Sequence, residues 1–413
     1  MPTRRGWTAF AAGLAFWVGA RFIGSDDLHM VATGLAVLPF LATAFVQWNR
    51  VRLDVHRHLS SPRVHAGSRV VVTVDITNQG STTTPFLLLE DVLSPALGKP
   101  ARLVVTGVPP GSRQTVSYSV ATRHRGRYTV GPLSISITDP FGLARVKIQT
   151  QSVNDLIVYP AVEELEAWTI GMQGAGAGES TVRHLFRSVA EFYTMREYVT
   201  GDDLRRIHWP SVARTGHLMI RQDESTRRST ATIFLDNRSG ALGVDASPGF
   251  EKGVSVAASV GRLLIKAGFA VRLATLDAEP IQVSETALLE TLAMVGPVRT
   301  RGIADALTTL RSAARADTSL ALVTAPPEGH ELAAMSRIGS GFGRKLAVFI
   351  HPVSLATLPE EARAEFETRA YVARATLQHA GWEIFVIPPD GRLADVWRSN
   401  RRSRKLQVAG SFS

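Results

Sequence analysis

The sequence has no cysteine among its 413 residues. Without thiols there is no disulfide framework, no zinc–thiolate or iron–sulfur site and no cysteine nucleophile. Charged residues make up only 20% of the chain and hydrophobic residues 45%, which excludes a wholly disordered protein. Acidic residues are fewer than basic ones. The chain has 46 Lys and Arg against 36 Asp and Glu, which gives a net charge of +10. This surplus favours anionic partners such as lipid headgroups, nucleic acid or acidic proteins.

Two long apolar runs open the chain. Trp7–Gly24 is interrupted only by Arg21, and Leu28–Trp48 carries no formal charge. A membrane-spanning helix needs about 20 apolar residues, so both runs qualify, and their short connection predicts an antiparallel hairpin. Basic residues at the outer ends and acid at the turn predict that both ends lie in the cytoplasm. These charges are Arg4, Arg5, Arg50, Arg52 and Arg57 at the ends and Asp26 and Asp27 at the turn.

A cleaved signal peptide is the alternative interpretation of the amino terminus. Arg4 and Arg5 would form its charged region, and the sequence Val-Gly-Ala at 18–20 is an acceptable cleavage site. The rest of the chain would then be an exported binding module. A signal peptide leaves the second and longer apolar run unexplained, so we expect the hairpin.

The middle of the chain, residues 51–150, changes to a period of two. Apolar and polar residues alternate in Val70–Ile76, Val116–Val120 and Leu133–Ile137, and turn sequences such as Pro-Pro-Gly at 109–111 separate the runs. Alternation predicts antiparallel strands with one buried face and one solvated face. Several short strands at this spacing predict a small β-sandwich, a module that more often binds or positions than catalyses.

Residues 229–400 alternate apolar strands with amphipathic helices. Thr232–Asp236 is the first strand, and Ser247 with Pro248 is typical of a helix start. This alternation predicts an α/β domain with a doubly wound parallel sheet. Ligands of such sheets bind beyond the carboxyl ends of the strands, where Asp236 lies. Residues 401–413 form a basic tail that either faces an anionic membrane surface or is simply solvated.

Residues 151–228, a linker and a signature segment, follow neither pattern. The glycines at 171–178 lack the Lys-Ser/Thr of a phosphate loop and predict a flexible linker, so we expect no ATP binding by this route. Charged residues then mix with aromatic ones, either as a docking surface for a partner or as an internal ion-pair network. The candidates are Arg196, Glu197, Tyr198, Gly201, Asp202, Asp203, Arg205, Arg206, Trp209 and Arg214.

The order of residues in this segment carries a resemblance. Arg-Glu-Tyr, Gly-Asp-Asp, Arg, Ile, Trp and Ala-Arg-Thr-Gly within 196–216 resemble the signature of the bacterial domain-of-unknown-function family fifty-eight, with departures at His208 and Pro210. The sequences at 125–128 and 139–143 resemble the end of that family's β-region. The resemblance implies a membrane-anchored protein with a divergent von Willebrand factor A-like domain. It also implies a MoxR-type AAA+ ATPase encoded nearby, often with a transglutaminase-like membrane protein.

A von Willebrand factor A-like domain implies a Mg²⁺ site formed by Asp-x-Ser-x-Ser after the first strand and by a later Thr and Asp. Residues 236–240 read Asp-Asn-Arg-Ser-Gly, which leaves a degenerate site at Asp236 and Ser239. Arg238 stands in a ligand position, where a cation repels Mg²⁺, and the later loop at Thr324 has no acid. We therefore expect no metal and no cofactor, with Asp236 capping the following turn.

The sequence thus predicts a multidomain protein of the cell membrane with its soluble domains in the cytoplasm. The domains are the two-helix hairpin at 1–50, the β-sandwich at 51–150, the linker and signature segment at 151–228, the von Willebrand factor A-like domain at 229–400 and the tail at 401–413. We expect a scaffold that binds the lipid bilayer and a MoxR-type ATPase, without catalytic residues and without nucleic acid. The alternative is a metal-dependent enzyme that uses Asp236 with the Asp202 and Asp203 region. The client process and the oligomeric state stay open.

Overall fold

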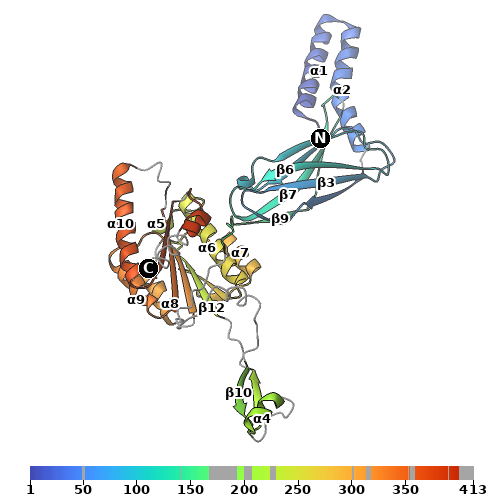
Figure 1. Ribbon diagram of the computed structural model, residues 1–413. Helices are drawn as coiled ribbons and strands as arrows, with labels where there is room; N and C mark the ends of the chain where they lie inside the picture. The colour runs from blue at the N-terminus through green and yellow to red at the C-terminus, as the bar shows by residue number, and fades with distance from the viewer. Residues whose placement is uncertain are drawn as a thin grey trace. The chain divides into compact units, whose positions relative to one another are not determined.

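The computed structural model describes residues 1–48, 52–139, 141–166, 193–199, 207–223, 229–299, 302–312, 318–351, 353, 359–388 and 390–399 (Figure 1). The chain divides into two compact units, Met1–Ala161 and Val162–Ser413.

The first unit begins with two antiparallel helices, α1 (Arg4–Ile23) and α2 (Asp26–Trp48) (Figure 1). Gly24 ends α1 in a left-handed conformation, with φ at 72°. Small residues form the contact between the helices, because a Cβ atom at Gly13 would lie 2.6 Å from the backbone nitrogen of Ala36. Both helices are long and apolar enough to cross a membrane, as the two apolar runs predicted.

Two antiparallel-type sheets form the rest of this unit. Strands β1, β3 and β6 make one sheet, and β2-β9-β7-β4-β5 make the other, with β8 paired to β7. Among the described strands of this unit, only β2 and β9 pair in parallel. The strands are β1 (Leu53–Leu59), β2 (Arg63–His65), β3 (Arg69–Asn78), β4 (Leu87–Leu93), β5 (Ala101–Val105), β6 (Arg113–Ala121), β7 (Gly126–Thr138), β8 (Arg145–Gln149) and β9 (Asn154–Tyr159), and a short 3-10 helix lies at Pro95–Leu97.

The inner faces of the two sheets share a hydrophobic core. In β3 the residues Val70, Val72, Val74 and Ile76 are all fully buried, which confirms the alternation predicted for this run. Val74 and Ile76 pack with side chains from β4 and β7 of the other sheet, namely Leu87, Leu89, Leu133, Ile135 and Ile137.

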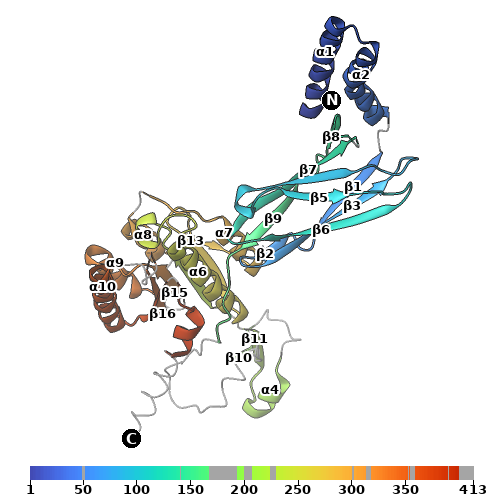
Figure 2. The ribbon, with the colours of Figure 1, turned by 90° about the horizontal axis from the view of Figure 1, so that it is seen from above.

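The helical hairpin is joined directly to this sheet pair. The backbone of Thr3 donates to the carbonyl of Leu143 at 2.7 Å, and its hydroxyl donates to the carbonyl of Gly142 at 2.6 Å. From α2, Ala42 and Val46 belong to the same core as Val74 and Leu87. Figure 2 shows the ends of both helices close to β8. The helical hairpin is therefore packed on the β-sheets, a contact that the sequence did not predict.

A buried ion pair crosses between the two sheets. Arg57 of β1 donates to Asp91 of β4 at 2.6 Å, and their side chains are 2% and 1% exposed. The hydroxyl of Tyr118, on β6, donates to the other oxygen of Asp91 at 2.6 Å. Burial, and then the hydrogen bond to Asp91, raise the pKa of Tyr118 far above its usual value, so the phenol keeps its proton. The guanidinium of Arg57 also donates to the side chain of Asn154 at 2.8 Å.

The second unit contains a six-stranded sheet in the order β14-β13-β12-β15-β16-β17. All pairs are parallel except β13 with β14, a short antiparallel edge strand that the sequence did not predict. The strands are β12 (Thr230–Leu235), β13 (Ala270–Thr275), β14 (Ile281–Gln282), β15 (Thr318–Thr324), β16 (Arg344–Ile350) and β17 (Glu383–Ile387).

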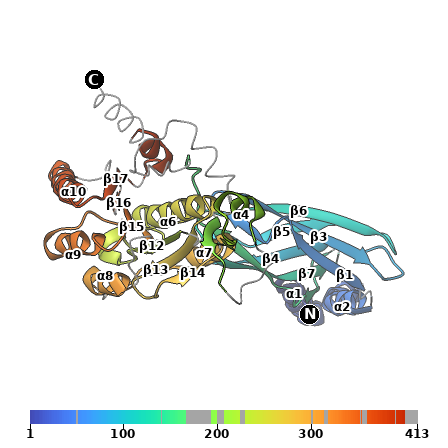
Figure 3. The same ribbon diagram turned by 60° about the horizontal axis from the view of Figure 1, so that its bottom comes forward.

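Helices cover both faces of this sheet (Figure 3). One core joins α8, α9 and α10 to side chains such as Phe234 and Phe349, while α6 and α7 cover the opposite face. Ser247 caps α6 by accepting from the backbone of Phe250, as the helix start at this position predicted. The helices are α5 (Ser239–Leu242), α6 (Pro248–Lys266), α7 (Glu285–Met294), α8 (Ile303–Ser312), α9 (Gly329–Gly339) and α10 (Glu360–His379), with a further helical segment at 393–399. The predicted strand–helix alternation is confirmed.

The chain enters this unit through Glu163, which connects three segments. Its carboxylate accepts from Lys252 of α6 at 2.6 Å and from the backbone N–H of Ala394 at 3.0 Å. Its own backbone N–H donates to the hydroxyl of Ser259 at 2.9 Å. Burial alone raises the pKa of Glu163, but the hydrogen bonds from Lys252 and Ala394 outweigh it, and the net pKa is lowered.

We expect Glu163→Gln to destabilise the second unit by about 1 kcal/mol near neutral pH, because the charge-assisted bond to Lys252 is lost. Because the pKa of Glu163 is lowered by folding, its ionised carboxylate contributes its full stabilisation above pH 4.5, the ordinary pKa of the group. This contribution disappears as the pH falls through the lowered pKa of the folded state. The melting-temperature difference between wild type and variant should therefore shrink at about pH 3.5. The control is Glu164→Gln, whose side chain is 82% exposed. Equal differences at both pH values would contradict this account.

Candidate functional site

The carboxyl end of β12 carries a buried carboxylate that is held by an arginine. Asp236 follows β12 directly and is fully buried. The guanidinium of Arg238 donates to both oxygens of Asp236, each at 2.9 Å, and the hydroxyl of Thr324 donates to one of them at 2.6 Å. Thr324 ends β15, the neighbour of β12 in the sheet. The arrangement thus lies where the chain leaves two adjacent parallel strands.

A second carboxylate completes the cluster. Glu331, in the first turn of α9, accepts from the same guanidinium at 2.5 Å and 3.3 Å. The side chains of Arg238 and Glu331 are 18% and 21% exposed, so the pair lies partly at the surface. Burial alone lowers the pKa of Arg238, but its hydrogen bonds to Asp236 and Glu331 outweigh this and raise it above its usual range. The guanidinium therefore stays charged between two carboxylates.

The structure brings together only some of the residues that were considered for the metal site. Asp236 and Thr324 come together, and the backbone N–H of Arg238 donates to Asp236 at 3.2 Å, the turn cap that the sequence predicted. Ser239 instead begins α5, and its backbone donates to the carbonyl of Val298 at 3.0 Å. Among the residues that the structure describes, no three His, Asp or Glu side chains are grouped to hold a metal ion.

Sequence reasoning missed Glu331. Its only signal was that an acid opens the helix after β15, where it could reach a cation following β12. The metal hypothesis takes Arg238 only as a residue that disrupts a ligand set and so predicts no charge pairing across this edge. The structure shows Arg238 as the centre of the cluster, with a carboxylate on either side.

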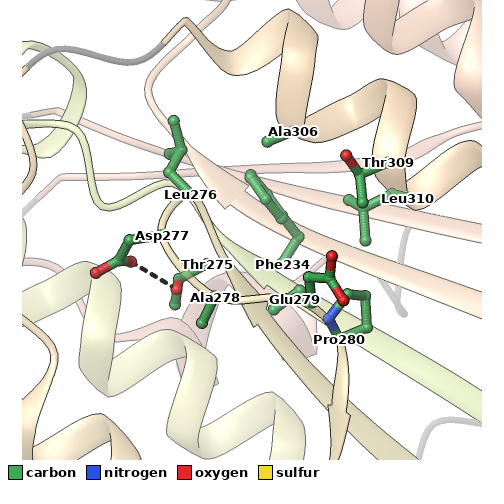
Figure 4. Close-up of a pocket in the computed structure, with 11 residues that line it drawn as sticks. Phe234, Thr275, Leu276, Asp277, Ala278, Glu279, Pro280, Ala306, Thr309 and Leu310 are labelled. Carbon is green, nitrogen blue, oxygen red and sulfur yellow. Dashed lines mark hydrogen bonds between the residues drawn. The ribbon is translucent and has the colours of Figure 1, made fainter.

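Asn237 connects this cluster to the loop after β13. Its fully buried amide donates to Asp277 at 3.0 Å and to the carbonyl of Gly296 at 2.9 Å, while it accepts from the backbone of Leu276 at 3.1 Å. The hydroxyl of Thr275 donates to the same oxygen of Asp277 at 2.8 Å (Figure 4). A cavity of about 170 Å³ lies beside this loop, with Phe234 and Leu310 on its apolar side (Figure 4).

The described part of the signature segment forms a small antiparallel hairpin. Strands β10 (Tyr193–Glu197) and β11 (Met219–Asp223) pair, and α4 (Trp209–Thr215) lies between them in the chain. The sequence predicted neither strand. The backbone of Tyr198 donates to the carbonyl of Leu218 at 2.8 Å, which continues the pairing.

The structure describes only some of the candidate residues of this segment. Trp209 is 66% exposed, Glu197 and Arg214 are exposed, and Tyr198 is half-buried. Arg196 lies in β10, where its backbone alone is described. The remaining candidates, Gly201, Asp202, Asp203, Arg205 and Arg206, lie outside the described residues.

Taken together, the cluster at the end of β12 is suited to holding structure and not to proton transfer. Both oxygens of Asp236 accept hydrogen bonds from Arg238, and one also accepts from Thr324, which leaves this carboxylate engaged. A general base needs a free oxygen within reach of the proton that it removes. The paired charges instead connect β12, β15 and α9 at one edge of the sheet.

The comparison with known families now decides what the signature segment resembles. The family described as "Protein of unknown function DUF58" matches residues 194–369. This confirms the predicted resemblance for that span. The DUF58 match begins in β10 and ends in α10, so it includes the described signature hairpin, Asp236, Arg238 and Glu331.

A curated relative extends the comparison without supplying a function. The "Uncharacterized protein YeaD" of Bacillus subtilis (strain 168) is 26% identical over 263 residues, which are 60% of this chain. The aligned part spans about 63% of the length of that relative.

Solved structures show weak likenesses. The CARDB domain of the PF1109 protein from Pyrococcus furiosus has a TM-score of 0.20 at 12% identity, covering 26% of this chain and 93% of that one. A beta-glucosidase from Listeria innocua has a TM-score of 0.18 at 11% identity, covering 26% and 16%. The Pseudomonas fluorescens glycosylase AlkC has a TM-score of 0.19 at 10% identity, covering 32% and 39%. Scores this low carry no argument about function.

Proposed function

We propose that this protein is a membrane-anchored adaptor. Its helical hairpin holds it in the bilayer, and its soluble units face the cytoplasm, where the signature segment and the α/β unit bind a MoxR-type AAA+ ATPase. The adaptor couples that ATPase to a task in the cell envelope or in protein maturation, with a transglutaminase-like membrane protein as a further associate. Binding, and not catalysis by this chain, is its contribution.

The arrangement of the α/β unit supports a von Willebrand factor A-like fold in this proposal. Strand β12 lies between β13 and β15 in the sheet. The chain therefore first adds β13 on one side of β12 and then returns to add β15 on the other side. Helices cover both faces, as a doubly wound sheet requires (Figure 3). Asp236 lies at the point where the strand order reverses, the usual ligand position of such sheets.

The observation that carries the proposal is the guanidinium of Arg238 in that position. A positive charge lies against Asp236 at 2.9 Å and is held by Glu331 on its other side. The Mg²⁺ ligand set of a von Willebrand factor A-like domain would need Asp236 as a ligand and would bring its own cation next to this arginine. The residues present do not fit a metal ion, and the cluster stabilises a binding domain without a metal.

The exposed side chains of the signature segment support a partner contact there. Trp209, at the start of α4, is 66% exposed, and Leu218, directly before β11, is 41% exposed. Tryptophan and arginine are the residue types that most often dominate binding energy at protein interfaces, and Arg214 lies on the same short helix as Trp209. The segment also lies within the DUF58 match.

Orientation is testable because the chain has no cysteine of its own. We expect Asp27→Cys, at the turn of the hairpin, to react with a membrane-impermeant maleimide on intact cells. Lys99→Cys, in the sheet pair, should react only after lysis, because the positive charges flanking the hairpin predict that this unit faces the cytoplasm. Labelling of Lys99→Cys on intact cells would place the soluble units outside, away from any ATP-driven partner, and would overturn the proposal.

A further inference from the structure

A large open cavity lies at the foot of the helical hairpin. It measures about 970 Å³, opens to solvent and is lined by residues of the first unit. Arg4 and Arg5 come from the first turn of α1, Gln47 comes from the end of α2, and Arg145 and Lys147 come from β8.

The charge of this cavity is of one sign. The cavity is lined by four exposed basic side chains, those of Arg4, Arg5, Arg145 and Lys147. Its lining contains no Asp or Glu. In the part of the chain that the structure describes, none of these four cations forms an ion pair. The neighbouring Asp139 does not neutralise them, because it is buried and its two oxygens accept from backbone N–H groups of its own loop.

The position of two of these cations is unfavourable without an anion. Arg4 and Arg5 occupy the first turn of α1, which contains no acidic residue. The amino end of a helix carries a partial positive charge and disfavours cations. A bound anion would be attracted by this end of the helix as well as by the four side chains, and would compensate the repulsion among them.

The level of the cavity relative to the two apolar helices indicates the source of the anion. It lies where two apolar helices end, which is the level of the lipid headgroups when the hairpin spans a bilayer. Trp7, one turn further along α1, is 54% exposed, and exposed tryptophans mark this interfacial level. Backbone hydrogen bonds fix β8 at the same depth, because the N–H of Arg145 donates to the carbonyl of Met1 at 2.9 Å.

We propose that this cavity binds the phosphate of an anionic phospholipid headgroup. Arg145 and Lys147 approach the phosphate from the β8 side, and Arg4 and Arg5 approach it from the helix side. The lipid would then join the anchor to the sheet pair and hold the soluble part at a set distance from the membrane. This inference depends on the hairpin being embedded in the membrane and is independent of any ATPase partner.

The test uses the purified full chain in detergent, titrated with phosphatidylglycerol or with phosphatidylcholine and followed by native mass spectrometry. We expect one phosphatidylglycerol to be retained at concentrations that leave phosphatidylcholine unbound. Arg145→Gln with Lys147→Gln should weaken phosphatidylglycerol binding by about tenfold, since each cation near an anionic headgroup contributes to binding. The matched control is Arg69→Gln with Lys99→Gln, which removes the same charge from exposed positions outside the cavity and should change binding less than about twofold.

Four results would overturn the proposal. The first is equal retention of both lipids, and the second is an equal loss in the control pair, which would show a general effect of net charge. The third is displacement of the lipid by glycerol 3-phosphate at equal concentration, which would assign the site to a soluble phosphate. The swapped variant Arg145→Lys with Lys147→Arg keeps both charges and should bind like wild type. The fourth is loss of binding in that variant as well, because it would show that the positive charge at these two positions does not determine binding.

Discussion

Replacing Asp236 by alanine is expected to destabilise the α/β unit by about 3 kcal/mol, because one partner of a buried ion pair is removed. The fully buried carboxylate accepts from Arg238 and from Thr324, and the variant leaves the hydroxyl of Thr324 without this acceptor and the guanidinium of Arg238 with Glu331 as its remaining carboxylate. Hydrogen–deuterium exchange measures the stability of each unit separately through the exchange rates of its backbone amides. The protected amides of β12 and β15 should exchange about a hundredfold faster in the variant, while those of the first unit stay unchanged.

The matched control for this prediction is Asp395→Ala. Asp395 pairs with Arg398 at 2.6 Å, but the two side chains are 57% and 53% exposed, so its loss should cost at most about 0.5 kcal/mol. Mg²⁺ should leave the melting temperature of the wild-type chain unchanged. A rise with Mg²⁺ that Asp236→Ala abolishes would contradict the account, because it would show a metal site and favour the metal-dependent enzyme.

A larger loss is expected in the first unit for Asp91→Ala, about 4 kcal/mol. Asp91 is the shared acceptor of Arg57 and Tyr118, which lie on the opposite sheet. Without it, the guanidinium of Arg57 stays buried with only neutral partners, and the phenol of Tyr118 loses its acceptor. The amides of β3 and β4 should exchange roughly a thousandfold faster, since each 1.4 kcal/mol is a factor of ten.

The control for Asp91 is an exposed pair of the same chemistry. Asp155 accepts from Arg127 at 2.7 Å, with side chains that are 49% and 59% exposed. Asp155→Ala should therefore change exchange in β3 and β4 less than about threefold, because solvent screens such pairs. A similar effect of the two substitutions would show that burial does not determine the contribution of the Asp91 pair.

The periodic elements of this fold could be predicted because each signal is local. The alternation of β3, the apolar length of α1 and α2, and the Ser247 cap of α6 all depend on residues within one element. The edge strand β14 and the hairpin of β10 and β11 could not be predicted in this way. Their strands are short, and their register depends on partners elsewhere in the chain.

The candidate site was predictable at Asp236 for a different reason. A strand end in a parallel sheet marks a ligand position whatever the ligand is, so the location followed from the pattern. Its occupant did not follow, because Glu331 reaches Arg238 from α9, 93 residues further along the chain. The docking of the hairpin on β8 was missed for the same reason, since the contacts join Thr3 to Leu143.

The measurement that tests the central claim most directly is site-specific photo-crosslinking in living cells. A benzophenone amino acid replaces Trp209, exposed in the signature segment, or Tyr371, an aromatic residue 74% exposed on α10 that serves as the matched control. Both substitutions exchange one exposed aromatic side chain for another. The account predicts that a MoxR-type ATPase is captured from position 209 and not from position 371. Capture of no ATPase from position 209 at normal protein level, or equal capture from both positions, would contradict it.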